Sequence, residues 1–172
     1  ADEGLLAVDL AGRQVAVVGT GGAARAVLFA LKQVGCGPVT VIARNPLKAA
    51  GLLSHFGLKG QTLALGNPAP PVALLVNASS LGMTGQPPLT LDLSGLPDDA
   101  LVYDVVTSPI ETPLLAEARG RSLDTVDGLE MLVSQAAVAF ELFFGQAPPR
   151  DGEEELRELL LSPPSRGGAG VG

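Results

Sequence analysis

The feature that most constrains this chain is a glycine turn that directly follows a short apolar run. Val15 to Val18 is typical of a buried strand, and Gly19-Thr-Gly-Gly-Ala-Ala-Arg25 then leads into an alanine-rich pattern with helical spacing. A second apolar run, Val39 to Ala43, follows at the distance of a strand–helix–strand unit. These segments predict a parallel sheet with the glycine turn at the carboxyl end of a strand.

Three small residues in this turn fit the spacing G-x-G-x-x-[G/A] of a dinucleotide-binding loop. Gly19 permits the tight turn, Gly21 lets a pyrophosphate approach the backbone, and Ala24 lets the helix pack closely on the strand. The helix that begins near Gly22 then directs its amide groups and positive dipole end at the phosphates. The spacing alone is weak, since glycine turns are common, but the flanking strands favour a nucleotide site over a purely structural turn.

The end of the second strand indicates which dinucleotide is expected. An NAD site usually has Asp or Glu there to accept hydrogen bonds from the ribose 2′-hydroxyl, whereas this chain has Ala43-Arg44-Asn45. A guanidinium binds a 2′-phosphate through paired charge-assisted bonds, so Arg44 favours NADP. The alternative is that Arg44 is an ordinary solvated residue. Lys48, one helical turn on, either adds charge to the site or is an ordinary surface lysine.

The alternation of strands and helices along the rest of the chain predicts an α/β fold with a doubly wound parallel sheet, a Rossmann-like domain. Further strands are expected at 61–65, 72–76, 101–106 and 123–126, and further helices at about 46–55, from about 111, at 129–144 and at 153–161. A proline- and glycine-rich loop is expected at 84–99. The predicted organisation is the end of a helix at 1–13, the sheet domain at 14–127, closing helices at 128–161 and a disordered tail at 162–172.

The composition argues against several other classes of protein. Aromatic residues make up 3% of the chain and the formal net charge is −7, which disfavours a nucleic-acid partner. Cys36 and His55 are the only residues of their kinds, so we expect no disulfide framework and no metal site. A lone cysteine, no membrane-length apolar run and no signal peptide before the first strand together lead us to expect a cytoplasmic protein.

Several segments together resemble the C-terminal NADP-binding domain of shikimate dehydrogenase. The resemblance runs from about residue 4 to about residue 161. The segments occur in the family's order: Gly19-Thr-Gly-Gly-Ala-Ala-Arg25, Ala43-Arg-Asn45, Asn77-Ala-Ser-Ser-Leu-Gly-Met83, Tyr103-Asp-Val-Val106, Thr112-Pro-Leu-Leu115 and Asp127-Gly-Leu-Glu-Met-Leu-Val-Ser-Gln135. Members of this family reduce 3-dehydroshikimate with NADPH, or oxidise shikimate with NADP, in chorismate and aromatic amino acid biosynthesis.

The resemblance also implies roles for individual residues. It implies contacts with the cofactor for Gly19, Thr20, Gly21, Gly22, Ala23, Arg44, Asn77, Ser79, Val105 and Gly128, the last two near the nicotinamide. Asn45 and Lys48 are expected at the cofactor site because they lie in the same turn as Arg44 and one helical turn beyond it. Gln135 would hydrogen-bond a substrate hydroxyl, or it is simply a polar residue at the edge of an apolar helix face. Thr107 stands where the family usually has a tyrosine that contacts substrate, so a hydroxyl remains there without the ring.

One expected feature of the family is missing. Oxidation of an alcohol removes the hydroxyl proton as well as a hydride, and the family uses a Lys/Asp pair on an N-terminal substrate domain to handle that proton. Lys32, Lys48 and Lys59 all fall in or near helices of the cofactor domain, and Ala1 stands where the family's Asp would align. We therefore expect no catalytic residue in this chain, a missing N-terminal substrate domain, and no activity of this polypeptide alone.

Two alternatives stay open. One is a quinate/shikimate dehydrogenase that also uses NAD, which an acidic residue beside Arg44 would favour. The other is a non-catalytic module that binds NADP without a reaction. The expected partners are shikimate or 3-dehydroshikimate and the missing domain, and a homodimer is left open.

Overall fold

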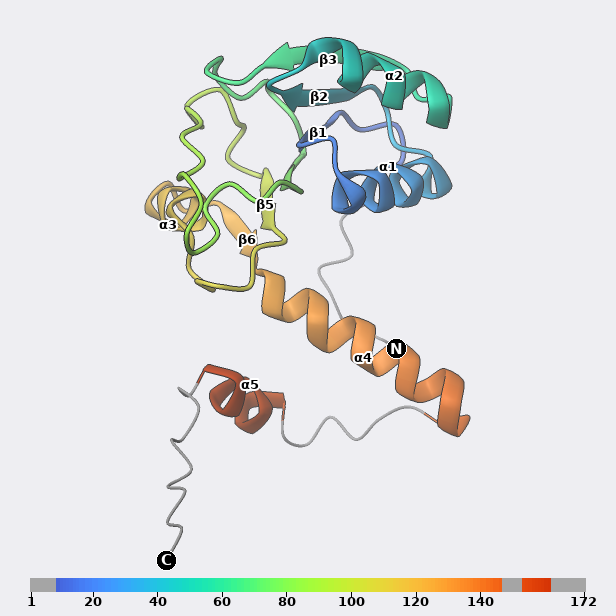
Figure 1. Ribbon diagram of the computed structural model, residues 1–172, viewed down its shortest axis with the longest axis vertical. Coiled ribbons are helices and arrows are strands. Elements are labelled where there is room, and N and C mark those ends of the chain that lie inside the picture. The colour runs from blue at the N-terminus through green and yellow to red at the C-terminus, as the bar shows by residue number, and fades with distance from the viewer. Residues whose placement is uncertain (1–8, 147–152, 162–172) are drawn as a thin grey trace, which may run out of the picture. The chain divides into compact units, whose positions relative to one another are not determined.

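The computed structural model describes residues 9–146 and 153–161, and its contacts divide the chain into two compact units (Figure 1). The first unit runs through Gly128 and contains the sheet, and the second begins at Leu129. Of the helix end expected at 1–13, residues 1–8 lie outside the described residues, as does the disordered tail expected at 162–172. Residues 9–13 are not helical, and Ala11 instead forms an isolated bridge with Cys36.

One six-stranded sheet forms the centre of the first unit. Its strand order is β3-β2-β1-β4-β5-β6, and every neighbouring pair is parallel. The order reverses between β1 and β4, as in doubly wound folds, so the predicted fold class is confirmed. The strands are β1 (Val15–Val18), β2 (Val39–Ala43), β3 (Gly60–Ala64), β4 (Leu74–Asn77), β5 (Leu101–Asp104) and β6 (Asp124–Val126).

Side-chain caps mark the beginning of two of the helices of this unit. The side chain of Asn45 accepts hydrogen bonds from the backbone N–H groups of Leu47 and Lys48, at 3.1 and 3.2 Å. Thr112 accepts from the N–H of Leu115 at 3.3 Å, and a proline follows each of the two caps. The predicted helix starts at these positions are confirmed. The helices are α1 (Gly22–Val34), α2 (Pro46–Phe56) and α3 (Pro113–Gly120).

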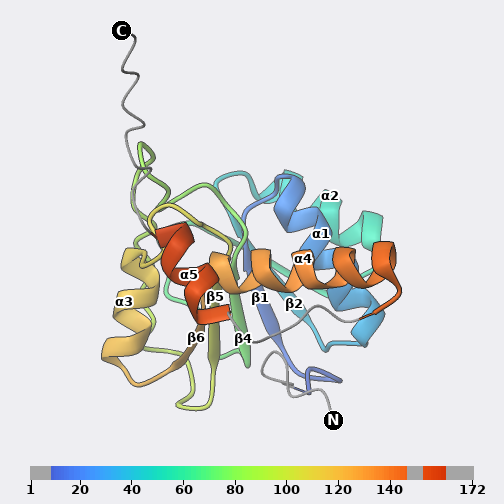
Figure 2. The same ribbon diagram turned by 90° about the horizontal axis from the view of Figure 1, so that it is seen from below.

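Successive residues of each buried strand pack into different cores, because their side chains point to opposite faces of the sheet. In β1, Val15 and Val17 belong to one buried cluster, whereas Ala16 and Val18 belong to the other. Helices α1 and α2 cover the first face, and α3 lies on the second (Figure 2). Burial on both faces explains why these strands are nearly continuous runs of aliphatic residues.

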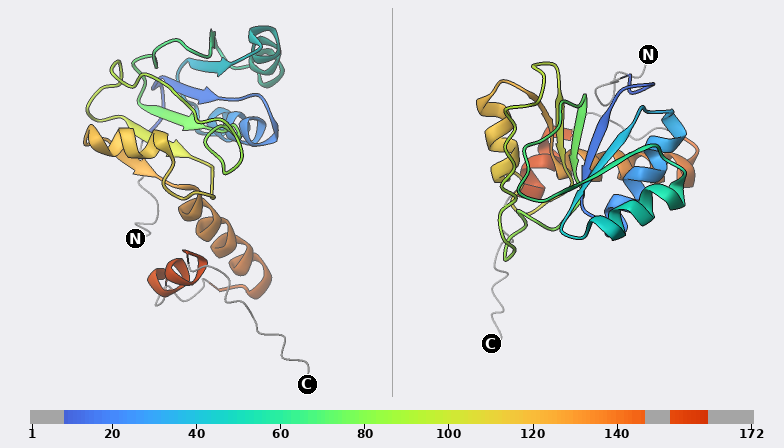
Figure 3. Two further views of the ribbon diagram at one scale, coloured as in Figure 1. Left: turned by 60° about the vertical axis from the view of Figure 1, so that its left-hand side comes forward. Right: turned by 90° about the horizontal axis from the view of Figure 1, so that it is seen from above.

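The connection from β4 to β5 is a long loop that packs beside α3 on the second face (Figure 3). Its inward side carries leucines that are at most 4% exposed. Burial of each such side chain stabilises the fold by about 1.5–3 kcal/mol. The loop therefore completes the second core beside α3, although it contains no helix itself. The loop expected at 84–99 is confirmed. The buried leucines are Leu89, Leu91, Leu93 and Leu96.

Strand β5 ends at a buried carboxylate, Asp104, which is 0% exposed. One of its oxygens, Oδ1, accepts from the side chain of Asn77 and from the N–H of Val106, both at 3.0 Å. The other, Oδ2, accepts from the hydroxyl of Thr112 at 2.7 Å. The bond from Val106 turns the backbone out of the ladder, so β5 is two residues shorter than the predicted 101–106. Burial raises the pKa of Asp104 and outweighs the lowering by its hydrogen-bond donors.

The second unit contains most of α4 (Gly128–Phe144) and all of α5 (Glu153–Leu161). Arg157 and Glu130 pair at 4.0 Å within it, and both side chains are partly exposed, so the pair contributes little to stability. Among the described residues, no helix combines the length and the apolar character that a bilayer crossing requires.

Replacement of Gly19 by alanine is expected to destabilise the first unit. Gly19 has φ +110°, and an added Cβ would lie 3.0 Å from the backbone oxygen of Ala78. We expect Gly19→Ala to lower the free energy of unfolding, measured with urea, by about 1–3 kcal/mol. Gly21→Ala is the matched control, because Gly21 has φ −85° and a Cβ added there would meet no atom within 4 Å. Equal stability of the two variants would contradict this explanation.

A second prediction concerns the buried carboxylate. Because the pKa of Asp104 is raised in the folded state, its stabilising contribution is complete below its ordinary value of 3.8 and is lost as the pH rises through the raised value. The unfolding free energy of the wild type minus that of Asp104→Asn should therefore fall as the pH rises above 3.8.

Asp92 gives the matched control for this pH dependence. The N–H of Ser94 donates to its carboxylate at 2.8 Å and lowers its pKa. The unfolding free energy of the wild type minus that of Asp92→Asn should rise with pH across the acid range. Its slope against pH is therefore opposite in sign to the slope for Asp104→Asn. Denaturation curves at a series of pH values measure both free-energy differences. If the two differences changed with pH in the same direction, the assigned directions of the two pKa shifts would be refuted.

Candidate functional site

A cleft of about 840 Å³ lies at the carboxyl ends of the central strands. It is found where the strand order reverses between β1 and β4, which is where open α/β sheets bind ligands. Its lining comes from the turns after β1, β2, β3, β4 and β5. The described residues that line it are Val18 to Ala23, Ile42 to Asn45, Lys48, Leu65, Ala78 to Leu81, Met83, Gln86, Pro87 and Val105.

The glycine turn places the beginning of α1 in this cleft. Gly19 donates its N–H to the carbonyl of Ile42 at 2.9 Å, which fixes the turn against the end of β2. Gly21 is the residue before the helix, and no side chain caps the first turn of α1. The N–H of Arg25 is paired with the carbonyl of Gly21 at 3.0 Å, one helical turn on. The preceding amide groups of α1 therefore form a set of donors suited to an anion.

The turn after β2 adds positive charge to the same cleft. Arg44 follows the strand directly and is exposed, and Lys48 lies in the first turn of α2. Neither α1 nor α2 has an acidic residue in its first turn, and the lining includes two cations and no carboxylate. In a chain of net charge −7, this local excess of positive charge favours an anionic ligand. Asn45 uses its side-chain oxygen to cap α2.

The wall formed by the turn after β4 depends on Asn77, which is itself 0% exposed. Its Oδ1 accepts from the N–H and the hydroxyl of Ser79, at 3.1 and 2.6 Å. Its Nδ2 donates to the carbonyl of Leu81 and to Asp104, both at 3.0 Å. These bonds use the full capacity of the amide, so Asn77 shapes the wall from behind and has no hydrogen bond left for a ligand.

The structure brings most of the predicted cofactor residues to one cleft, and it places a few elsewhere. Asn77 lies behind the cleft wall and does not line it. An alanine Cβ at Gly128 would lie 2.5 Å from the backbone oxygen of Val106, so close backbone packing explains this glycine. Thr107 is exposed in the segment after β5, and Gln135 is exposed on α4 in the second unit. The predicted residues that line the cleft are Gly19, Thr20, Gly21, Gly22, Ala23, Arg44, Asn45, Lys48, Ser79 and Val105.

Several cleft residues were missed at the level of sequence. Leu65 directly follows β3, so the rule that ligands bind at carboxyl strand ends pointed to it. Met83, Gln86 and Pro87 belong to the long loop, whose path no local pattern reveals. The role of Asp104, which is buried and does not line the cleft, was overlooked as well, although a carboxylate at the end of an apolar strand is a signal that the sequence does contain.

Known proteins resemble this chain in sequence. The family described as the shikimate 5′-dehydrogenase C-terminal domain matches residues 128–152. The shikimate dehydrogenase (NADP⁺) of Sphingopyxis alaskensis is 63% identical over 158 residues, which cover 92% of this chain and 58% of that protein. The chain thus spans little more than half the length of this relative.

Solved structures resemble it in fold. The ligand-free 5-ketofructose reductase of a Gluconobacter strain has a TM-score of 0.79 at 27% identity, covering 90% of this chain and 58% of that one. The shikimate 5-dehydrogenase of Thermus thermophilus in complex with NADP(H) and shikimate has a TM-score of 0.69 at 34% identity, covering 85% and 54%. In sequence and in fold, the chain is thus similar to shikimate dehydrogenases, and its residues 128–152 match the C-terminal domain of that family.

Proposed function

We propose that this chain is the NADP-binding part of a shikimate dehydrogenase, an enzyme that interconverts 3-dehydroshikimate plus NADPH and shikimate plus NADP. The observation that carries the proposal is the cleft itself, in which an uncapped helix N-terminus and two cations lie at the switch point of the sheet without a carboxylate. The name of the Sphingopyxis relative and the complex of the Thermus enzyme support the same cofactor and substrate.

The proposed cofactor contacts follow from the chemistry of the lining. The pyrophosphate would lie against the loop Gly19–Ala23, where the open surface at Gly21 leaves room for it. Arg44 would hold the 2′-phosphate, with Lys48 adding charge. Asn45, by capping α2, fixes the turn that carries both cations. When bound, the nicotinamide would exchange a hydride with the substrate carbon, and this chain would supply its binding and orientation.

The substrate end of the proposal rests on the family resemblance. Val105, which lines the cleft, and Gly128 are proposed to lie near the nicotinamide, and Thr107 and Gln135 each stay proposed substrate contacts. Thr107 offers a hydroxyl where the family usually has tyrosine. We therefore propose that this site binds substrate more weakly than a site with the family's tyrosine.

Proton transfer is assigned to groups outside these 172 residues. Lys32 lies in the last turn of α1, Lys48 in the first turn of α2, and Lys59 directly before β3. All three lie in the sheet unit, and none is at a position of the family's catalytic motif. We therefore propose that the polypeptide by itself binds NADP and does not turn over substrate, in a reducing, cytoplasmic setting.

Two other functions remain distinguishable from this one. A quinate/shikimate dehydrogenase that uses NAD would need an acceptor for the ribose 2′-hydroxyl, and the cleft lining has no carboxylate to provide it. A non-catalytic NADP-binding module would have the same cleft. Binding of the cofactor alone does not separate that module from an enzyme, so activity has to be measured.

Replacement of Arg44 by alanine tests the cofactor assignment. The loss of charge-assisted hydrogen bonds to the 2′-phosphate should weaken NADP binding by about 1.5–3 kcal/mol and leave NAD binding nearly unchanged. Calorimetric titration of both dinucleotides measures the difference. The control is Lys32→Ala, which also removes one positive charge but lies in the last turn of α1, at the end of that helix away from the cleft. This variant should bind NADP and NAD as the wild type does. Equal losses for NADP and NAD in Arg44→Ala would defeat the assignment.

A hydride-transfer assay tests the proposed reaction. Shikimate-dependent reduction of NADP should be absent with this chain alone and present when a shikimate dehydrogenase substrate domain precedes it, because that domain carries the acid/base pair. NADPH formation is followed by its absorbance. Turnover by the chain alone would refute the assignment of proton transfer to other groups, and inactivity of the extended protein would favour the non-catalytic module.

A further inference from the structure

A continuous series of hydrogen bonds through Asn77, Asp104 and Thr112, here called the hydrogen-bond chain, runs from the cleft wall to the start of α3. Asn77 holds the turn after β4 and donates to Asp104, and Asp104 accepts in turn from Thr112 at 2.7 Å. All three residues are at most 1% exposed. Among the described residues, no buried side-chain nitrogen or oxygen lacks a partner, so the chain is complete without a ligand.

This chain fixes two backbone segments that line the cleft. On one side, Asn77 binds Ser79 and the carbonyl of Leu81. On the other, the carbonyl of Asn77 accepts from the N–H of Val105 at 3.1 Å, and Asp104 accepts from the next N–H along the chain. Ser79, Leu81 and Val105 all line the cleft. The position of this wall therefore depends on side chains that do not line it.

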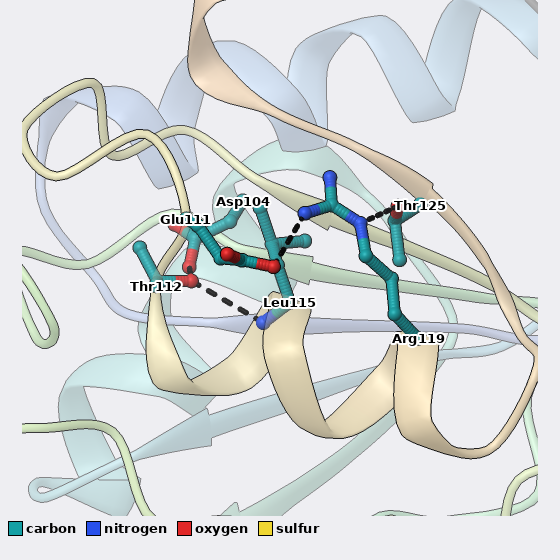
Figure 4. A network of polar contacts seen from close by, with 6 residues as sticks. All are labelled: Asp104, Glu111, Thr112, Leu115, Arg119 and Thr125. Carbon is teal, nitrogen blue, oxygen red and sulfur yellow. Dashed lines mark hydrogen bonds and ion pairs between the residues drawn. The ribbon is translucent and has the colours of Figure 1, made fainter.

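Thr112 is the outer anchor of the chain. Its hydroxyl donates to Asp104 and accepts from the N–H of Leu115, so it connects the carboxylate to the first turn of α3 (Figure 4). Beside it, Arg119 bridges Glu111 at 2.9 Å and the hydroxyl of Thr125 at 3.0 Å. The side chains of Arg119 and Glu111 are 42% and 62% exposed, so that bridge is weakly stabilising, and the buried bond of Thr112 is the stronger link.

The wall held in this way belongs to one half of the cleft. Arg44 follows β2, on one side of β1, whereas Ser79 and Val105 follow β4 and β5, on the other side. A dinucleotide with its diphosphate at the Gly21 end of α1 and its 2′-phosphate at Arg44 must direct its nicotinamide half toward β4 and β5. The buried chain thus stands behind the nicotinamide half alone.

We propose that Asp104 and Thr112 are positioning residues for the nicotinamide half of the cofactor, acting through Asn77 and the backbone of Val105. This inference rests on the proposed NADP site and gives a role in it to two residues whose motifs had none assigned. A shared carboxylate sets the distance between the turns after β4 and β5, and the hydroxyl of Thr112 holds that carboxylate in place. Loss of the hydroxyl lets both turns shift, while the glycine turn and Arg44 keep their positions.

The test compares two probes that occupy different parts of the cleft. NADPH reaches both halves, whereas adenosine 2′,5′-bisphosphate carries the 2′-phosphate without a nicotinamide. We expect Thr112→Val to weaken NADPH binding about tenfold, or 1.4 kcal/mol, with adenosine 2′,5′-bisphosphate changed less than about twofold. Thr112→Ser, which retains the hydroxyl, should restore NADPH affinity and the enhanced fluorescence of bound NADPH.

Controls separate positioning from a general loss of stability. Ala118→Gly destabilises α3 to an extent similar to the loss of a helix cap and leaves the hydrogen-bond chain intact, so the ratio of the two affinities should not change. If Thr112→Val does not fold, Asp104→Asn gives the same comparison, since an amide at position 104 has one acceptor oxygen in place of two. The inference is overturned if Thr112→Val weakens the binding of both probes equally or leaves NADPH affinity unchanged. It is also overturned if Ala118→Gly changes the ratio of the affinities for NADPH and adenosine 2′,5′-bisphosphate. Failure of the wild type to bind either probe instead defeats the NADP site itself.

Discussion

The close approach of two backbones at the switch point of the sheet is the constraint on which the rest of the structure depends. The turn after β1 passes so near the turn after β4 that an added Cβ on Gly19 would lie 3.0 Å from the carbonyl oxygen of Ala78. This contact brings the start of α1 and the turns after β4 and β5 to the same cleft. Two residues on, the surface at Gly21 is open, because no neighbouring atom fills the space of a side chain there. The cleft is therefore a consequence of backbone geometry first and of side-chain chemistry second.

Polar groups around the cleft are of two kinds. Some are available to a ligand, as are the first amides of α1 and the side chains of Arg44 and Lys48. Others, such as those of Asn77 and Asp104, are fully used within the protein. In the proposed NADP site, the first kind would supply affinity for an anion and the second would fix the surface on which the ligand lies. A buried residue without ligand contact would in this way be part of the proposed site.

Much of the fold was predictable because the chain alternates apolar strands with well-capped helices. Asn45 and Thr112, each followed by proline, mark two helix starts that the structure has at these positions. Of the cleft, the glycine turn and Arg44 were predictable because strand ends are known ligand positions. The long loop after β4 was not, since its path depends on tertiary packing of its leucines. The role of Asp104 was hidden because its partners are distant in sequence. Gly128 fits a family motif, yet the structure gives a steric reason for glycine at this position, because a side chain there would collide with backbone oxygen atoms.

The central claim is that the glycine turn at the switch point binds the diphosphate of NADP. Backbone amide chemical shifts recorded by NMR during titration of this chain with NADP test it most directly. The account predicts saturable shifts at Gly21, Gly22 and Ala23, accompanied by shifts at Arg44, with much smaller changes at the distant end of α1. Unchanged amides in the glycine turn at saturating NADP would contradict it.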